Sequence, residues 1–515
     1  MASTLQIPAE RESTISPAFR LNLRAAWLQG LLLYLACFAV LGFLAFSVQG
    51  FVGTDDYYHA RMADLIITQG RLRVDFPWLP QTILANEQFV DHHLLFHMYV
   101  APWAHWGGLA GAKLATVSIA AGVFVAAWAL LRQIGVRKAW LWTLALFAMS
   151  SPFLYRLLMV RTQGAALLLV IVALYLLAAR RERWLLPLAF AFAWLYNGFV
   201  LILGVVALYA AAEFIVERKL AWRAPLFAAV GLALGLVINP YFPNNFAFIF
   251  DHLGAKVDFE NGVRVGSEWY PYSTSVLMVN AGGALAALAL GVLRGSFGTR
   301  KRDTAETALL LVAFLTLFML LRSRRFIEYF PAFALLFVAA SWGRGGIAWA
   351  GWLPLRWLRR AAFAAVAVTV LVVGGLTLRG ALNDIGGSAN TTYMAGAAQW
   401  LAANTEPGTP VFQTDWDDFT RLFYYNTSNT YLIGLDPTYL QLANPLMWEN
   451  WVAITQGRVE QPSRLIQEQF GSAYVISDTR HGAFEDQART DPGLELVYRD
   501  DNALIWRVDG VDPAG

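Results

Sequence analysis

Residues 53 to 61 read GTDDYYHAR and directly follow a long apolar segment. If a helix begins here with Thr54 as its N-cap, Asp55 and His59 lie on one face, one helical turn apart. Such a face can bind a divalent cation, present a general base, or hold a phosphate group through Arg61. The simpler alternative is that acidic residues only decorate the N-terminus of a helix.

The composition of the whole chain is that of a membrane protein. The chain has 515 residues, of which 57% are hydrophobic and only 15% are charged, whereas a soluble protein carries about a quarter charged residues. The net charge of +3 gives no indication of a nucleic-acid partner. The single cysteine, Cys37, excludes an intrachain disulfide.

Eleven apolar segments are candidates for membrane spans, and several are short for a hydrocarbon core of ~30 Å. They predict a mainly α, polytopic membrane protein with about 11–13 transmembrane helices. The segments are 26–48, 113–131, 139–153, 164–179, 184–196, 198–216, 224–240, 275–293, 305–321, 326–342 and 361–378.

Basic connections set the orientation. With the N-terminus inside, the positive-inside rule places the most basic connections on the cytoplasmic face: 132–138, 180–183, 217–223 and 294–302. The stretch 94–112 is apolar enough to span, but a span there would reverse every later basic loop. We therefore expect it to form an interfacial helix.

This topology places three regions outside: loops 49–112 and 241–274, and the chain after 379. The last region alternates short strand-like runs with helical stretches, which predicts a small external α/β domain over 380–515 after a transmembrane domain over 1–379. We expect a multi-pass protein of the cell (inner) membrane whose polar site faces the periplasm.

Two further clusters lie near the external face. Asp91, His92 and His93 in FVDHHLLFH are metal-ligand types that can join Asp55 around a cation. Three arginines between the ninth and tenth apolar segments break the positive-inside rule, and phosphate groups of a lipid-linked substrate would supply their counter-charge. Ordinary headgroups or a pair with Glu328 are the alternative. The arginines are Arg322, Arg324 and Arg325.

Taken in order, these motifs resemble the catalytic subunit of oligosaccharyltransferase and its single-chain bacterial and archaeal counterparts, in the GT-C superfamily of membrane glycosyltransferases. By resemblance, DDYYHAR makes Asp55 the metal-binding catalytic aspartate, and VGSEW makes Glu268 the residue that closes over the acceptor. An arginine within RSRRFIEY would grip the donor phosphates. QTDWDDF would open the external domain and face the acceptor with Trp416, Asp417 and Asp418.

Two departures qualify what the resemblance implies. The family's second acidic motif should fall near YRLLMVRTQG, where this chain offers Arg161, Thr162 and Gln163 in place of carboxylates. A cation, Mg²⁺ or Mn²⁺, would then need Asp91, His92 or His93, or the reaction is metal-independent. TDWDDF also lacks the second tryptophan and the glycine of the peptide-reading element, so the acceptor is left open between lipid, glycan and protein.

The prediction is an integral-membrane glycosyltransferase that uses a polyprenyl phosphate or pyrophosphate sugar and inverts the anomeric carbon. The external arginines, with Arg61 and His59, would bind the donor phosphate. Asp55 or Asp56 would orient or deprotonate the acceptor. The competing hypothesis is a transporter or flippase of an anionic lipid-linked substrate, although carriers concentrate ionisable groups near the bilayer midplane and here they gather on one face.

Overall fold

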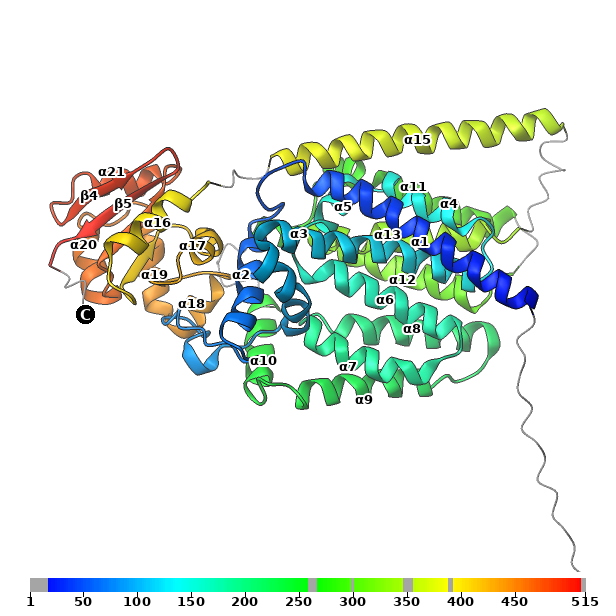
Figure 1. Cartoon of the computed structure of the whole chain (residues 1–515), viewed down its shortest axis with the longest axis horizontal. Coiled ribbons are helices and arrows are strands. Elements are labelled where there is room, and N and C mark those ends of the chain that lie inside the picture. The colour runs from blue at the N-terminus through cyan, green and yellow to red at the C-terminus, as the bar shows by residue number, and fades with distance from the viewer. Residues whose placement is uncertain (1–16, 258–265, 298–300, 346–354, 388–391, 511–515) are drawn as a thin grey trace, which may run out of the picture.

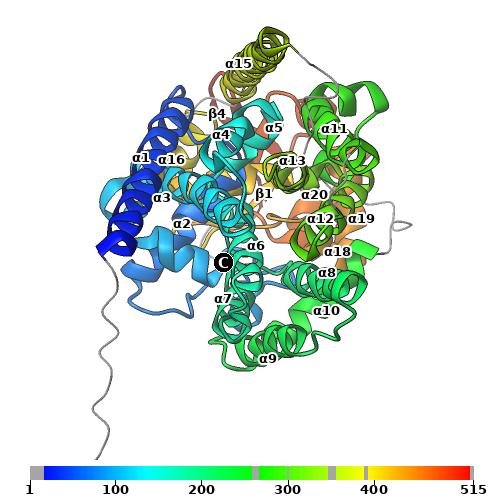
Figure 2. The same cartoon turned by 90° about the vertical axis from the view of Figure 1, so that its right-hand side faces the viewer.

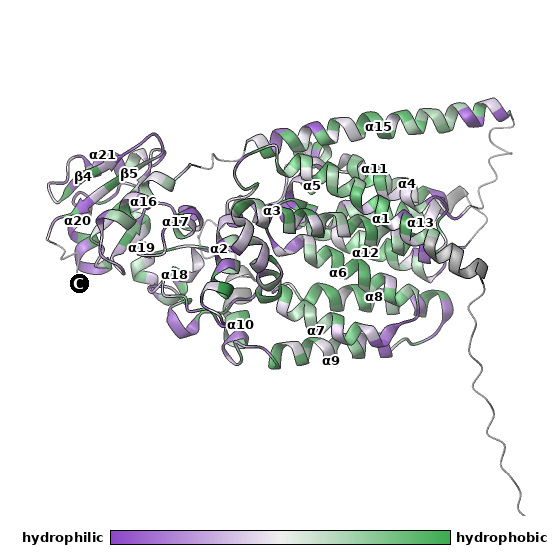
Figure 3. Cartoon of the chain, viewed as in Figure 1, coloured by the Kyte–Doolittle hydropathy of each residue, from purple (hydrophilic) through white to green (hydrophobic). Residues whose placement is uncertain are grey.

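The computed structural model describes residues 17–257, 266–297, 301–345, 355–387 and 392–510. Long helices run side by side in a bundle, and a separate C-terminal domain lies beyond one end of it, with α2 (Asp55–Thr68) between the two (Figure 1). The bundle is largely apolar along its length, and hydrophilic residues gather toward its ends and over the C-terminal domain (Figure 3).

Each of the eleven predicted apolar segments forms helix. Segment 139–153 is divided into α4 (Ala139–Leu144), η2 (Ala145–Ala148) and the start of α5 (Ser151–Leu157). The others form α1 (Pro17–Ala45), α3 (Leu94–Gln133), α6 (Thr162–Ala178), α7 (Leu185–Leu195), α8 (Val200–Glu217), α9 (Arg223–Val237), α11 (Thr274–Phe297), α12 (Thr304–Arg322), α13 (Phe330–Trp342) and α15 (Arg356–Gly386).

Fewer helices are full-length spans than the sequence predicted. Within the described ranges, six are long and apolar enough to cross a membrane, or seven if the bent pair of α5 and α6 counts as one span. Ala139–Ala148, Arg223–Val237 and Phe330–Trp342 are shorter apolar helices. The chain is a multi-pass membrane protein, but the prediction of about 11–13 spans exceeds the number that helix length supports.

The predicted interfacial helix over 94–112 is part of a longer element. α3 extends from Leu94 to Gln133, but its backbone leaves helical geometry at Gly108, where φ is 54° and ψ is −139°. A side chain would strain this conformation, which glycine adopts freely. Gly111 also approaches the backbone so closely that an added Cβ would lie 1.9 Å from the Trp103 carbonyl oxygen. The two halves of α3 therefore run in different directions.

A second break positions charged residues. α5 and α6 meet at an angle of 102° across a short connection that ends at Arg161. The two helices cannot continue one another, so the connection remains at the end of the bundle that faces the C-terminal domain. The external loop predicted at 241–274 contains α10 (Asn244–Val257) and η4 (Ser267–Trp269), while Asp258 and Glu260 lie outside the described residues.

The C-terminal domain is the small α/β unit that the sequence predicts. Its five-stranded sheet has the order β2-β1-β3-β5-β4, where β1 pairs in parallel with β2 and β3, and β5 pairs antiparallel with β3 and β4. The strands are β1 (Pro410–Gln413), β2 (Thr430–Tyr431), β3 (Tyr474–Asp478), β4 (Leu494–Arg499) and β5 (Ala503–Val508). The helical elements are α16 (Ala395–Asn404), η6 (Trp416–Asp418), α17 (Phe419–Tyr425), α18 (Thr438–Ala443), α19 (Pro445–Thr455), α20 (Pro462–Leu465), η7 (Ile466–Phe470) and α21 (Gly482–Ala488).

α15 links the bundle to this domain and stands at the outer edge of the bundle, as the end-on view shows (Figure 2). It continues to Gly386, past the domain boundary predicted at 379.

The first loop fastens the C-terminal domain to the bundle. Trp78 Nε1 donates a hydrogen bond to the Thr427 carbonyl at 2.8 Å, and the Tyr431 amide donates to the Trp78 carbonyl at 2.8 Å. α17 packs on α2, where the rings of Tyr57 and Tyr424 meet edge to face with centroids 5.3 Å apart. The space between the two units is thus enclosed by parts of both.

Candidate active site

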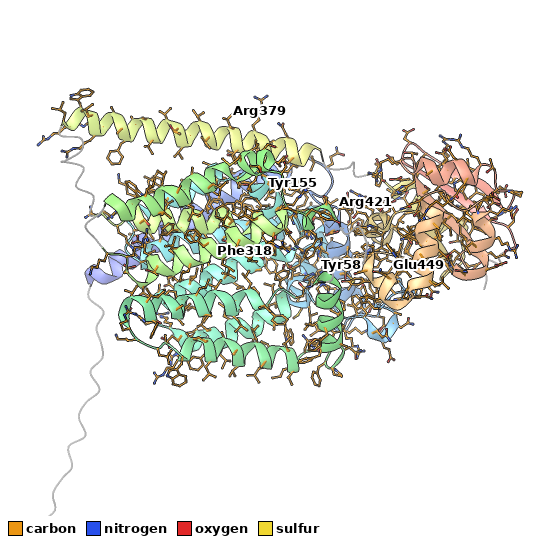
Figure 4. All side chains as sticks on the ribbon, turned by 180° about the vertical axis from the view of Figure 1, so that it is seen from behind. Tyr58, Tyr155, Phe318, Arg379, Arg421 and Glu449 are labelled. Atoms are coloured by element: carbon orange, nitrogen blue, oxygen red, sulfur yellow. The ribbon has the colours of Figure 1, made fainter. Side chains whose placement is uncertain are left out.

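A cavity of about 1010 Å³ lies where the bundle meets the C-terminal domain. Its bundle side is formed by α2, the histidines before α3, the break between α5 and α6, η4, and η5 (Arg324–Glu328). Asp415, Trp416, Asp417 and Asp436 line it from the C-terminal domain. Figure 4 shows Tyr58, another lining residue, close to this junction.

An arginine cluster dominates the bundle side. Arg161 Nη1 and Nη2 donate to the two carboxylate oxygens of Glu268 at 3.2 and 3.3 Å. Arg156 Nη2 donates to the same carboxylate at 2.8 Å and its Nε donates to Glu328 Oε1 at 2.6 Å. Arg325 Nη1 lies 3.5 Å from Glu268 Oε1. Three guanidinium groups therefore surround one carboxylate.

Burial alone would make Glu268 reluctant to ionise, but the guanidinium groups of Arg161, Arg325 and Arg156 hold the pKa of this carboxyl well below its usual range. Arg325 is further fixed over the Trp269 ring, with its Cζ 4.8 Å from the centroid. The Arg325 Nε is buried and has no hydrogen-bond partner among the described residues. This donor remains for a bound anion.

α2 brings Asp55 into the cavity. The helix begins at Asp55, as predicted, but Thr54 makes no side-chain cap; Asp56 instead accepts a hydrogen bond from the Gly53 amide at 3.0 Å. Asp55 Oδ2 lies 3.1 Å from Arg161 Nη2. Asp56 is fully buried outside the cavity lining, and burial raises its pKa to about 7. Only the first of the two adjacent aspartates faces the cavity.

The histidines in α2 and at the start of α3 contact one another. His59 Nδ1 and His97 Nε2 lie 2.8 Å apart, and His97 Nδ1 lies 2.7 Å from Asp91 Oδ2. Burial, together with the neighbouring histidines, lowers the pKa of His59 and His93 well below the usual range. Burial also lowers the pKa of His92 to about 4. All three line the cavity, and their lowered pKa values favour the neutral imidazole.

The structure does not assemble the predicted metal ligands into one set. Asp91 is directed at His97 and at the His93 amide, 2.9 Å away, whereas Asp55 is directed at Arg161. A guanidinium group beside Asp55 repels a cation. Within the described ranges, Asp415, Asp478 and His481 of the C-terminal domain form the group of three close metal-ligand side chains. As arranged here, Asp55 and Asp91 do not share a cation site, because each is held by another partner.

The wall formed by the C-terminal domain is acidic. Asp415 caps η6 by accepting from the Asp417 amide at 3.0 Å. Burial, with the negative charges of Asp55 and Asp415, raises the pKa of Asp417 to about 7. Trp416 and Asp417 both line the cavity, whereas Asp418 is buried behind them and its pKa is raised well above the usual range by burial. Asp417 can therefore exchange a proton near neutral pH.

Three of the five predicted phosphate-binding side chains point elsewhere. Arg61 donates to the Tyr424 carbonyl at 3.0 Å and pairs with Asp64. Arg322 is exposed at the end of α12, and Arg324 Nε donates to the Tyr270 carbonyl at 3.2 Å. Of the predicted set, Arg325 and His59 line the cavity.

The cavity also has an apolar part. Val200, Leu201 and Gly204 line it from α8, and Leu315 and Met319 line it from α12. Both helices are long and apolar enough to cross a membrane. The polar cluster is thus continuous with an apolar part of the cavity wall formed by two membrane helices.

Arg156 and Glu328 were not assigned to the site from the sequence. Arg161 was named there only because this residue stands where the family has a carboxylate. A signal was present, because the predicted topology places 154–163 outside, so that two arginines there break the positive-inside rule as Arg322 to Arg325 do.

Solved structures with a similar fold cover almost the whole chain. The apo oligosaccharyltransferase of Archaeoglobus fulgidus matches 94% of this chain and 75% of its own with a TM-score of 0.62 at 13% identity. ArnT from Cupriavidus metallidurans, bound to undecaprenyl phosphate, matches 93% and 98% with a TM-score of 0.58 at 18% identity. The chain has the GT-C fold.

Mycobacterial arabinofuranosyltransferase AftD adds a third GT-C neighbour, with a TM-score of 0.56 at 18% identity over 92% of this chain and 41% of AftD. No protein-family model and no curated protein matches the sequence. The resemblance drawn from short motifs is therefore confirmed at the level of the GT-C fold.

Proposed function

We propose that this protein is an inverting membrane glycosyltransferase. It moves a sugar from a polyprenyl-phosphate-type donor to an acceptor that enters between the bundle and the C-terminal domain. In this proposal the protein resides in the inner membrane and its cavity opens toward the periplasm.

The observation that carries the proposal is that one cavity holds both the guanidinium cluster and an apolar wall formed by α8 and α12. An amphiphile with a phosphate head and a hydrocarbon tail matches both parts at once, because guanidinium forks bind phosphate oxygens and apolar side chains accept the tail. Two GT-C neighbours support this match, since ArnT was solved with undecaprenyl phosphate and the Archaeoglobus enzyme with a dolichol-phosphate and an inhibitory peptide.

The chemistry needs little from the protein beyond charge and position. An acceptor oxygen or nitrogen attacks the anomeric carbon from the side opposite the phosphate, so the configuration inverts. The sugar–oxygen bond breaks, and its electron pair remains on the phosphate, where Arg156, Arg161 and Arg325 stabilise the added negative charge.

The acceptor proton goes to a carboxylate. Asp417 has a pKa near neutrality and lines the wall that faces Asp55, so it is the better proton acceptor. Asp55 is held by Arg161 and serves to orient the acceptor or the sugar. Asp56, buried outside the cavity, supports the start of α2.

The test is transfer of a radiolabelled sugar from a purified polyprenyl-phosphate donor by the protein in proteoliposomes. Lipid, glycan and peptide acceptors are offered in parallel, and Asp55→Ala is the inactive control. A labelled product with at least one acceptor class supports the proposal. Movement of a fluorescent lipid-linked substrate across the bilayer, without transfer and abolished by the same variant, would establish a flippase instead.

A further inference from the structure

Glu268 occupies the point where the guanidinium groups of the cavity converge. Its two oxygens take the forked donors of Arg161, and Arg156 and Arg325 approach from other sides. A phosphate group presents oxygens to guanidinium in the same forked geometry. The carboxylate therefore sits in an anion site suited to the phosphate of the proposed donor.

The backbone that carries Glu268 is anchored, whereas its side chain reaches into the cavity. Ser323 Oγ donates to the Glu268 carbonyl at 2.8 Å, and the Arg324 amide donates to the Tyr270 carbonyl at 3.0 Å. Rotation about side-chain bonds can withdraw the carboxylate without moving η4. Exchange of the carboxylate for another anion needs no rearrangement of the fold.

Arg161 stands between two carboxylates, with Asp55 at 3.1 Å and Glu268 at 3.2 Å. Like a divalent cation, Arg161 bridges the two carboxylates. Unlike a bound cation, it forms directional hydrogen bonds, stays charged, and cannot be removed by solvent or a chelator. The other two guanidinium groups add further positive charge to the same space. A divalent cation has no place in this arrangement.

Charge balance indicates which phosphate fits. Among the groups paired directly with the three guanidinium groups, Glu268, Asp55 and Glu328 balance their charge. When Glu268 withdraws, a single positive charge is left over. A phosphodiester carries a single negative charge, whereas a pyrophosphate carries more, so a sugar linked through one phosphate restores neutrality.

We propose that Glu268 is a built-in counter-ion that holds the donor site until a polyprenyl-monophosphate sugar displaces it, with Arg161 in the role that a divalent cation would otherwise fill. This inference rests on the proposed function and specifies its donor class. Glu268 also has a role after transfer. The leaving phosphate gains the electron pair of the broken bond, and the returning carboxylate competes with it for the same guanidinium groups and promotes its release.

The experiment measures lipid binding and needs no sugar transfer. The probes are a polyprenyl phosphate methyl ester, which is a phosphodiester, and the corresponding polyprenyl pyrophosphate, each titrated into purified protein in nanodiscs and followed by tryptophan fluorescence. The variants are Glu268→Gln and Glu268→Asp. Glu449→Gln, an exposed change on α19, is the matched control.

We expect Glu268→Gln to bind the phosphodiester about tenfold tighter than the unaltered protein, because a charge-assisted competitor is removed. Glu268→Asp should fall between the two, and Glu449→Gln should match the unaltered protein. The phosphodiester should bind the unaltered protein more tightly than the pyrophosphate, and neither EDTA nor Mg²⁺ should change its affinity.

Unchanged or weaker binding by both Glu268 variants overturns the counter-ion role. Binding that EDTA abolishes and Mg²⁺ restores overturns the role given to Arg161. Sugar transfer that proceeds alongside either result leaves the proposed function standing, so the two failures are distinguishable. If neither lipid binds even to Glu268→Gln, the anion site itself is refuted, since that variant frees the guanidinium groups.

Discussion

The two walls of the cavity shift the pKa values of their carboxyl groups in opposite directions. On the bundle side every carboxylate that lines the cavity meets an arginine, and the pKa of Glu268 is held low. On the side of the C-terminal domain, burial and the nearby carboxylates of Asp55 and Asp415 raise the pKa of Asp417 to about 7. A wall of fixed positive charge suits the binding of an anion, whereas a carboxyl group that titrates near neutrality suits proton transfer. In the proposed function, donor and acceptor therefore contact different walls.

The largest effect should come from removing the carboxylate between the walls. Asp55→Ala frees Arg161 and removes the group that orients the reacting partners, so we expect transfer to fall by about 10³-fold or more, to background. Sugar transfer in proteoliposomes is the measurement. Asp64→Ala, on the same helix but outside the cavity lining, is the control for changes to α2. Residual activity above a few per cent would contradict the assignment.

Within the arginine wall, two neighbouring residues offer a sharper contrast. Arg325→Ala removes a guanidinium group that faces the leaving phosphate and should lower transfer by about 10²- to 10³-fold. Arg322→Ala removes an exposed arginine and should change transfer by less than about twofold. Steady-state kinetics on the two purified variants provide the comparison, and equal losses would show that the cavity lining does not define the donor site.

On the acidic wall, Asp417→Asn keeps the size and polarity of the side chain but removes its ability to accept a proton. We expect kcat to fall by about 10²-fold, with little change in the affinity for donor lipid. Asp501→Asn, exposed in the C-terminal domain, should be neutral. A variant that loses donor binding while kcat is retained would place Asp417 with the donor instead.

The smallest predicted effect is a pH dependence. A base with a pKa of about 7 is protonated and inactive below that pH, so transfer should rise as the pH increases through about 7 and level off above it. Below pH 7 the rate should fall about tenfold per pH unit. The low residual rate of Asp417→Asn should lack this rise. An acidic limb that persists in the variant assigns the titration to another group, such as Asp56.

Local pattern in the sequence was sufficient for the framework. The apolar segments became helices, α2 begins at Asp55, and the region after 392 contains the predicted small sheet. These features depend on hydrophobic periodicity and on residues close together in the chain. The position of the basic loops divided 94–131 into an interfacial helix and a span at residue 112, and the structure places a break in α3 at Gly108.

The composition of the site was harder to predict because its contacts join distant residues. Glu268 meets Arg156 and Arg161 more than 100 positions earlier in the sequence, and a charged residue alone does not identify its partner. The three arginines in RSRRFIEY looked alike in the sequence. Of the three, only Arg325 lines the cavity: Arg322 is exposed at the end of α12, and Arg324 in η5 donates to the Tyr270 carbonyl.

The length of α15 determines how this helix can lie in the membrane. It has 31 residues and therefore measures about 46 Å, more than the ~30 Å of a hydrocarbon core. Only 11% of its apolar window is buried against the rest of the protein, so lipid surrounds most of it. The helix must tilt or emerge from the bilayer, and it leads directly to the C-terminal domain. The tilt of α15 therefore depends on bilayer thickness, and the domain that carries the acidic wall of the cavity follows this helix in the chain.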